Sequence, residues 1–256
     1  MAKALRRIRE YLRAIDVVIE VVDARVARSG RNAVLDELAG TRTHVVALSR
    51  SDLAEAPSTR KWIEAYAERG SVAIAVDGRS RQSVARIART IAETPNRRSA
   101  RGASRAMIVG IPNSGKSTIV NALLRRGAAK IEARAGVTRQ VQWFRLASNV
   151  ELMDTPGVLP PKITGAAAQW KLAICGGVPV GRYDAQEVIA AFHDWLSAKR
   201  PHNTVPDLPT FAAARGFVRR GAEIDYHNAA ASYIRAFNEG LFGRISLEAP
   251  DDSEAA

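Results

Sequence analysis

Residues 110–118 read GIPNSGKST, which has the G-x-x-x-x-G-K-[ST] spacing of a phosphate-binding loop. Its two glycines let the backbone turn tightly, and successive N–H groups then form a concave nest for phosphate oxygens. The apolar run 106–109 predicts a buried strand before the loop, and the apolar residues after it predict a helix whose N-terminus faces the phosphates. The residues expected to bind a nucleoside triphosphate are Gly110, Asn113, Ser114, Gly115, Lys116, Ser117 and Thr118.

Several side chains in and after this loop predict how a metal ion and the terminal phosphates are held. Lys116 is expected to reach the terminal phosphates, and the Ser117 hydroxyl is expected to ligate Mg²⁺. The run DTPG, residues 154–157, follows an expected strand, where Asp154 can orient Mg²⁺ and the Gly157 N–H can sense a terminal phosphate. Thr138, in the polar segment between these motifs, is the expected second hydroxyl ligand of Mg²⁺.

A second motif, Ser49-Arg50-Ser51-Asp52, is similar to the [NT]-K-x-D pattern that reads guanine. The Asp52 carboxylate can accept two hydrogen bonds from the N1–H and N2–H₂ edge of guanine, whereas adenine offers no such pair of donors. Ser49 and Arg50 depart from the pattern, although the stem of Arg50 can still cover the base. The alternative interpretation is a strand followed by an ordinary helix cap at Ser51 or Asp52.

The composition excludes several classes of protein. The chain has 256 residues and is 46% hydrophobic, which is enough to bury a core, and no apolar run reaches the length that spans a bilayer. Cys175 is the single cysteine, so no internal disulfide can form, which fits a reducing compartment. The formal charge of +12 favours a polyanionic partner, nucleic acid first, and the alternative is an arginine-rich surface without such a partner.

Strands and helices alternate along the first part of the chain, which predicts a mostly parallel sheet covered on both faces. Residues 93–105 form a basic connector with little apolar content. The segment that follows the DTPG run and contains Gly165 is expected to be irregular. The expected strands are 16–22, 44–48, 71–76, 106–109, 141–146 and 150–153, and the expected helices of this part are 1–15, 33–38, 59–69 and 82–92.

From Asp184 onward the pattern is helical. Asp184 and Glu187 resemble a capping box, and a later helix is expected to begin after Asp225 and to end at Gly240. We therefore expect three parts. They are an α/β domain over residues 1–178, a small all-helical domain over 179–247 and a disordered acidic tail over 248–256.

The order of the motifs is unusual, because the base reader precedes the phosphate loop, whereas in ordinary GTPases it comes last. The same sheet can form if the old termini are joined within residues 93–105 and the chain is cut elsewhere, since domain termini often lie close together. In this respect the chain resembles the circularly permuted GTPases of the YlqF/RbgA type, the ribosome biogenesis GTPase A family, whose relatives include mitochondrial ribosome-associated GTPases. The remaining segments that carry the resemblance are 16–25, 29–32, 172–173, 221–225 and 243–248.

The resemblance implies a circularly permuted P-loop GTPase domain with a C-terminal helical domain that binds ribosomal RNA. It implies hydrolysis of GTP to GDP and phosphate that is slow without the ribosomal subunit, because Val158 stands where other GTPases place a water-orienting Gln. Lys116, Thr138 and Gly157 are then the expected catalytic residues. Asn113 matches a loop Asn associated with K⁺ binding, so the expected cofactors are GTP or GDP, Mg²⁺ and K⁺.

The resemblance further implies a cytoplasmic monomer of the bacterial type, rather than a mitochondrial matrix protein, that assists late assembly of the large ribosomal subunit. Ser114 departs from the family, which usually has Val there, and the chain lacks the aromatic-Pro-Gly-His stretch with which the family commonly begins. Two other functions remain open at this level. One is an RNA-binding module that holds nucleotide with little turnover, and the other is a metabolic P-loop phosphotransferase.

Overall fold

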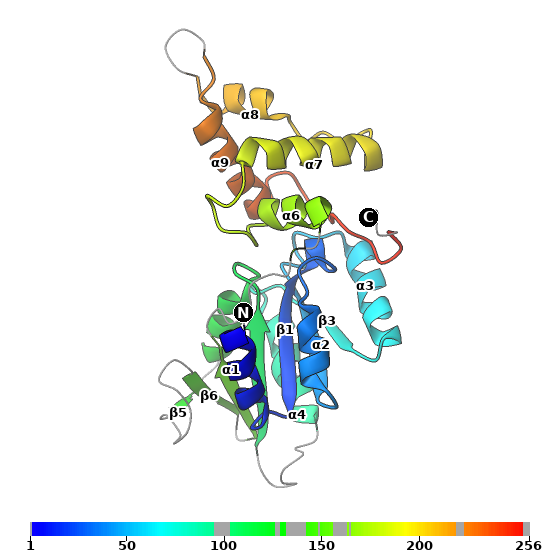
Figure 1. Ribbon diagram of the computed structural model, residues 1–256, viewed down its shortest axis with the longest axis vertical. Helices are drawn as coiled ribbons and strands as arrows, with labels where there is room; N and C mark the ends of the chain where they lie inside the picture. The colour runs from blue at the N-terminus through cyan, green and yellow to red at the C-terminus, as the bar shows by residue number, and fades with distance from the viewer. Residues whose placement is uncertain are drawn as a thin grey trace.

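The computed structural model describes residues 2–94, 103–125, 129–131, 142–147, 149–155, 163, 165–218 and 223–252. Within these residues the chain forms one sheet with helices on both faces, and a layer of helices lies over one end of the sheet (Figure 1). The strands are β1 (Val17–Asp23), β2 (Thr43–Ser49), β3 (Val72–Ala75), β4 (Ser104–Gly110), β5 (Ala129–Ile131), β6 (Gln142–Ala147) and β7 (Val150–Asp154). The α-helices are α1 (Ala2–Leu12), α2 (Ala33–Ala39), α3 (Ala56–Glu68), α4 (Arg81–Glu93), α5 (Lys116–Leu124), α6 (Gly165–Ile174), α7 (Ala185–Lys199), α8 (Leu208–Ala214) and α9 (Tyr226–Glu239).

The strand order in the described part of the sheet is β3-β2-β1-β4-β7-β6-β5. β1 pairs in parallel with both β2 and β4, and β4 pairs in parallel with β7. Only β6 and β5, at one edge, run antiparallel to their neighbours in this part of the chain. The pairing of β1 with β4 joins the half of the chain that carries the base reader to the half that carries the phosphate loop. This confirms the mostly parallel sheet expected for a circularly permuted chain.

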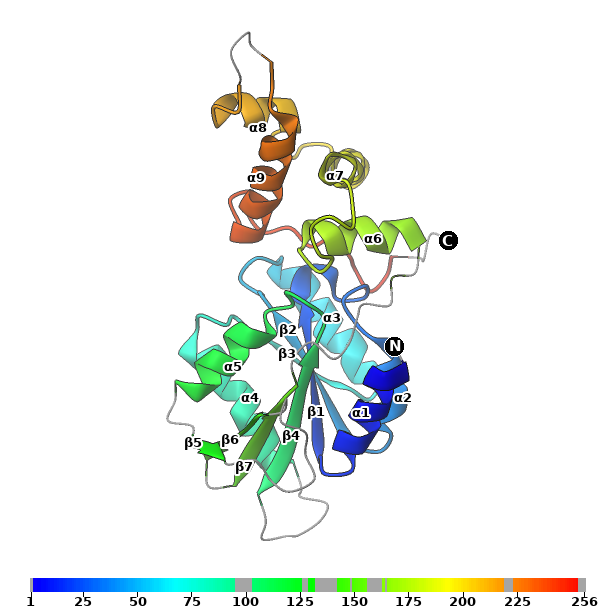
Figure 2. The same ribbon diagram turned by 60° about the vertical axis from the view of Figure 1, so that its left-hand side comes forward.

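β1 lies in the middle of the sheet, and all seven of its residues are buried. Because side chains alternate between the two faces of a strand, Val17, Ile19 and Val21 pack with α4 and α5. Val18 and Val22 face the other side, which α1, α2 and α3 cover. Figure 2 shows α4 and α5 on one side of the sheet and α1 and α2 on the other. The continuous apolar run is therefore the signature of a strand covered on both faces.

The helical layer is built on the helix starts and stops expected from the sequence. Asp184 caps α7 by accepting hydrogen bonds from two backbone N–H groups of the first turn, and Asp225 caps α9 by accepting one from the Asn228 N–H. Gly240 ends α9 in the left-handed conformation, with φ +80°. One expectation was wrong, because the segment from Gly165 is the helix α6 rather than irregular chain. α6 lies before residue 178, and its buried residues belong to the core of the helical layer.

The end of the chain also differs from expectation, because Glu248 is not part of a disordered tail. Its side chain is buried and accepts hydrogen bonds from the backbone N–H groups of Arg28, at 2.7 Å, and Ser29, at 3.0 Å. Its carbonyl oxygen accepts a hydrogen bond from Trp62 Nε1 at 3.2 Å. An acidic composition could not reveal these long-range partners. The described part of the chain extends to Asp252, and residues 253–256 lie outside it.

A polar cluster of residues from β1, β2 and α2 predicts a pH dependence of stability. His44 lies 3.1 Å from Asp36 Oδ1 and 3.3 Å from Glu20 Oε2. Burial alone would lower the pKa of His44, but its contacts with these two carboxylates outweigh burial and raise the pKa above its usual value. Protonated His44 therefore stabilises the folded state below the unfolded pKa of about 6.5, and this contribution is lost as the pH rises through the folded pKa.

We expect His44→Gln to destabilise the protein most at acidic pH. Urea unfolding of both proteins between about pH 5.5 and pH 8.5 measures this, because the difference in unfolding free energy should shrink as the pH rises. A difference that stays constant or grows with pH would contradict the assigned role of His44.

None of the described helices is long and apolar enough to cross a membrane.

Candidate nucleotide-binding site

The predicted phosphate loop lies at the carboxyl end of β4, and α5 starts at its Lys116. Gly115 has φ +87° and precedes the helix, so the backbone turns there into the first turn of α5. Gly110 lies so close to its neighbours that an added Cβ would come within 2.6 Å of Ser114 Oγ and 2.8 Å of Val21 O. The strand, tight turn and helix expected from the sequence are therefore present, with the N-terminus of α5 open to an anion.

Lys116 and Asp154 meet at the edge of the sheet where the parallel strands β4 and β7 end. Lys116 Nζ lies 2.6 Å from Asp154 Oδ1, and both side chains are largely shielded from solvent. Next to Asp154, Thr155 donates a hydrogen bond from Oγ1 to Ile108 O at 2.7 Å, which fixes the end of β7 against β4. Ser117 is exposed on the first turn of α5. Two expected ligands of Mg²⁺ and the phosphate-binding lysine are thus placed at the same strand ends.

Three other positions that the sequence singled out, Thr138, Gly157 and Val158, lie outside the described residues. Their expected roles stay predictions.

The candidate base reader follows β2 and lies against the phosphate loop. Ser49 Oγ lies within hydrogen-bonding distance of two carbonyl oxygens, Val22 O at 3.2 Å and Ser114 O, to which it can donate its one hydrogen. It lies 3.3 Å from where a Cβ on Gly115 would be. The alternative of a helix cap at Ser51 or Asp52 is wrong, because α3 begins only at Ala56 and its N-cap residue is Glu55. Ser51 and Asp52 therefore lie in a loop beside the phosphate site.

Arg50 is held differently from a side chain that only covers a base. Its backbone has φ +51°, which is unusual for a residue other than glycine. Its Nη1 donates a hydrogen bond to Asn238 Oδ1 at 2.9 Å and lies 3.6 Å from Asp23 Oδ2. The guanidinium group is thus bound to α9 of the helical layer, a contact that no local sequence pattern could predict. Asn113 also reaches this layer, because its Nδ2 donates to Gly176 O at 2.8 Å.

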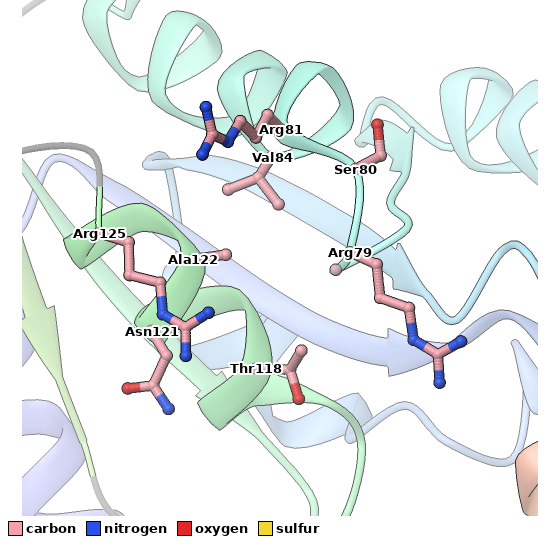
Figure 3. A pocket seen from close by; sticks show the side chains of 9 residues that line it. Arg79, Ser80, Arg81, Val84, Thr118, Asn121, Ala122 and Arg125 are labelled. Atoms are coloured by element: carbon pink, nitrogen blue, oxygen red, sulfur yellow. The ribbon is translucent and has the colours of Figure 1, made fainter.

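A hollow of about 760 Å³ adjoins the phosphate loop at Thr118 (Figure 3). It lies between the start of α4 and the exposed side of α5, and Gly78 approaches Thr118 closely enough that an added Cβ would lie 2.8 Å from Thr118 Cγ2. Apart from Thr118, the residues of this hollow belong to no motif named above, although the run GRSR, residues 78–81, places two arginines after β3. The side chains of its charged and polar lining are Arg79, Ser80, Arg81, Thr118, Asn121 and Arg125.

Ser114, which departs from the pattern that the resemblance implies, has an unusual environment in the structure. Its side chain is buried, and its hydroxyl has no hydrogen-bond partner among the described residues. A buried hydroxyl without a partner destabilises a fold by about 1–3 kcal/mol. We expect Ser114→Ala to raise the unfolding free energy by about 1 kcal/mol and to leave nucleotide affinity unchanged, because the expected contact is made by the amide. Urea unfolding and nucleotide titration test this, and a loss of stability would contradict it.

Comparison with known proteins places this geometry in a family. Residues 105–189 match a family described as "50S ribosome-binding GTPase". The chain is 33% identical to Ribosome biogenesis GTPase A of Priestia megaterium over 99% of this chain and 96% of the relative. It is 30% identical to Mitochondrial ribosome-associated GTPase 1 of Mus musculus over 97% of this chain and 88% of the relative.

Solved structures agree with these sequence relatives. GNP-bound YlqF from T. maritima superposes with a TM-score of 0.76 at 28% identity, covering 98% of this chain and 100% of that one. A GDP-bound YlqF structure gives a TM-score of 0.75 at 27% identity and covers 94% of this chain and 98% of that one. The permuted order of the motifs, the sheet and the helical layer all fit this likeness. The chain therefore belongs to the ribosome biogenesis GTPase A family of circularly permuted GTPases.

Proposed function

We propose that this protein is a GTP-binding and GTP-hydrolysing switch that assists late assembly of the large ribosomal subunit. The observation that carries the proposal is the contact between Lys116 and Asp154 at the carboxyl ends of two neighbouring parallel strands. The names of the relatives support the ribosomal role, because they describe proteins of ribosome biogenesis and ribosome association.

Nucleotide binding changes the partner of Lys116 in this proposal. The ammonium group leaves Asp154 for the terminal phosphates, whose greater negative charge attracts it more strongly. Asp154 and the Ser117 hydroxyl are the residues that would hold Mg²⁺ once Lys116 has turned to the phosphates. A carboxylate and a hydroxyl are the hard oxygen ligands that suit Mg²⁺, and phosphate oxygens complete the set. Bound Mg²⁺ would neutralise charge that develops on the transferred phosphoryl group.

Around the phosphates, the amides of Ser114 and Gly115 and the side chain of Lys116 stabilise negative charge. Thr138 is proposed to ligate Mg²⁺, and the Gly157 N–H is proposed to bind the terminal phosphate. Asn113 fits a K⁺ site, because its Nδ2 donates to Gly176 O, whereas its Oδ1, which has no partner among the described residues, could face a cation. A K⁺ ion there would add positive charge beside the phosphates.

The helical region 179–247 is proposed to contact ribosomal RNA. The chain carries a formal charge of +12, and phosphate contacts by lysine and arginine supply most sequence-independent RNA affinity. Exposed basic side chains of this region include Arg182, Lys199 and Arg215. The proposal assigns the protein to the cytoplasm as a monomer that binds the maturing subunit in its GTP form and leaves after hydrolysis.

Co-sedimentation with purified large ribosomal subunits tests the switch. The protein should pellet with the subunits in the presence of a non-hydrolysable GTP analogue and Mg²⁺, and much less so with GDP. Raising the salt concentration should weaken this binding steeply, because RNA contacts release counterions. Equal binding with both nucleotides would contradict the switch while leaving nucleotide binding intact.

A further inference from the structure

Asn238, near the end of α9, uses all the hydrogen-bonding capacity of its side chain. Its Oδ1 accepts from Arg25 Nη2 and from Arg50 Nη1, each at 2.9 Å. Its Nδ2 donates to Ile174 O at 2.7 Å and to Ile234 O at 2.9 Å. Because the two carbonyl groups can only accept, they require the amide nitrogen on their side. The oxygen of Asn238 is therefore aimed at the two arginines.

The turn that orients Asn238 also receives the phosphate loop. α6 ends in a Schellman motif, in which the Gly176 N–H donates to Ala173 O at 2.9 Å and the Gly177 N–H donates to Leu172 O at 2.7 Å. Gly176 has φ +79°, and its carbonyl oxygen accepts the hydrogen bond from Asn113 at 2.8 Å. The end of α6 thus contacts the phosphate loop directly and the base-reading loop through the amide on α9.

Arg25 and Asp23 form the fixed part of this arrangement. Asp23 accepts from Arg25 Nε at 3.0 Å and from Nη2 at 2.8 Å, and both side chains are almost fully buried. Burial alone would lower the pKa of Arg25, and the attraction of Asp23 outweighs it, so the guanidinium stays charged. Arg50 is more exposed than this pair, and its Nη1 is 3.6 Å from Asp23. Asn238 is therefore the neutral acceptor that lets a second cation sit beside Arg25.

We propose that Asn238 is a positioning residue of the nucleotide site, which fixes the guanidinium of Arg50 so that the base-reading loop keeps the conformation that binds guanine. The proposal rests on the proposed function, because the site it serves is the GTP site. With its charged end fixed, Arg50 presents its aliphatic stem to the base. Holding the unusual φ of Arg50 in the free protein lowers the ordering cost of binding, which is the energetic benefit of preorganisation.

The contact also makes the nucleotide affinity of the site depend on the helical layer. If Asn238 favours the binding-competent loop, bound nucleotide favours the α6–α9 arrangement equally, because coupling between two sites is reciprocal. The conformation of the layer proposed to contact RNA would then depend on whether a base occupies one end of the site and, through Asn113, on whether phosphates occupy the other end.

A double-mutant cycle tests the proposal, with the dissociation constant of a fluorescent GDP as readout. We expect Asn238→Ala and Arg50→Ala each to weaken binding about tenfold, corresponding to ~1.4 kcal/mol, and the double variant to be no weaker than Arg50→Ala alone. Asn238→Gln keeps an amide, with an acceptor for the arginines and a donor for the two carbonyl groups, and should bind within about threefold of the unchanged protein. Asn228→Ala, at the other end of α9, is the matched control. Any effect it has on the dissociation constant should add independently to the effect of Arg50→Ala.

Each result has one meaning. Full affinity in folded Asn238→Ala, or losses that add in the double variant, would overturn the positioning role. If Asn238→Ala does not fold, Arg50→Ala decides, because full affinity in that variant would show that holding Arg50 is not what matters. Circular dichroism melting checks folding of each variant. If the unchanged protein binds no GDP, the proposed function itself fails, which is distinct from every outcome of the cycle.

Discussion

Lys116→Ala is expected to lower GTP hydrolysis about 100- to 1,000-fold, the range found when one donor to a developing charge is removed. In the free protein Lys116 bonds to Asp154, so its removal leaves this carboxylate without its cation at the site where phosphates must bind. The loss should therefore combine weaker binding with slower chemistry. Single-turnover hydrolysis at saturating nucleotide, together with a binding titration, separates the two effects.

Lys61→Ala is the matched control for that experiment, because Lys61 is exposed on α3 and pairs only with the exposed Asp251 among the described side chains. Its effect on stability and hydrolysis should be negligible. Hydrolysis by Lys116→Ala within about threefold of the unchanged protein would contradict the assignment of the loop, since a phosphate-bound lysine cannot be removed at so small a cost.

Asp52→Asn is expected to weaken GTP binding about 100-fold and to shift preference toward xanthosine triphosphate. The carboxylate accepts from two donors of guanine, and hydrogen bonds to a charged group contribute about 1.5–3 kcal/mol each. Xanthine carries a carbonyl where guanine carries the 2-amino group, so an amide, which has a donor and an acceptor, matches it better.

Competition of GTP, ATP and xanthosine triphosphate against a fluorescent nucleotide measures this shift. Asp184→Asn, at the N-cap of α7, is the control, because asparagine caps helices as well as aspartate does. If Asp52→Asn keeps its preference for GTP, Asp52 does not read the base, and the loop after β2 has only a structural role.

Local patterns predicted the parts of this fold that depend on neighbouring residues. The continuous apolar run of β1, the glycine-containing loop before α5 and the caps at Asp184 and Asp225 are all encoded within a few positions of the chain. The order of the motifs, compared with that of ordinary GTPases, predicted the permuted sheet. These signals are strong because backbone sterics and burial act on short segments.

Contacts between distant segments could not be predicted. The bond from Arg50 to Asn238 spans 188 positions, and the burial of Glu248 against Arg28 spans 220. The sequence did not predict α6, because the apolar face of this helix is stabilised by packing against α7 and α9, which are distant in sequence. The site is therefore predictable in its nucleotide-facing loops, and unpredictable in the helical layer that supports them.

In the proposed function, the protein hydrolyses GTP in response to the large ribosomal subunit. Hydrolysis of GTP and ATP should be measured in KCl and in NaCl, each with and without purified large subunits. We expect hydrolysis of GTP to be slow, to exceed that of ATP, to rise when subunits are added and to rise further in KCl. Subunit binding without turnover under any condition would contradict the claim and favour a module that only holds nucleotide. Equal use of ATP would show that the site does not select guanine.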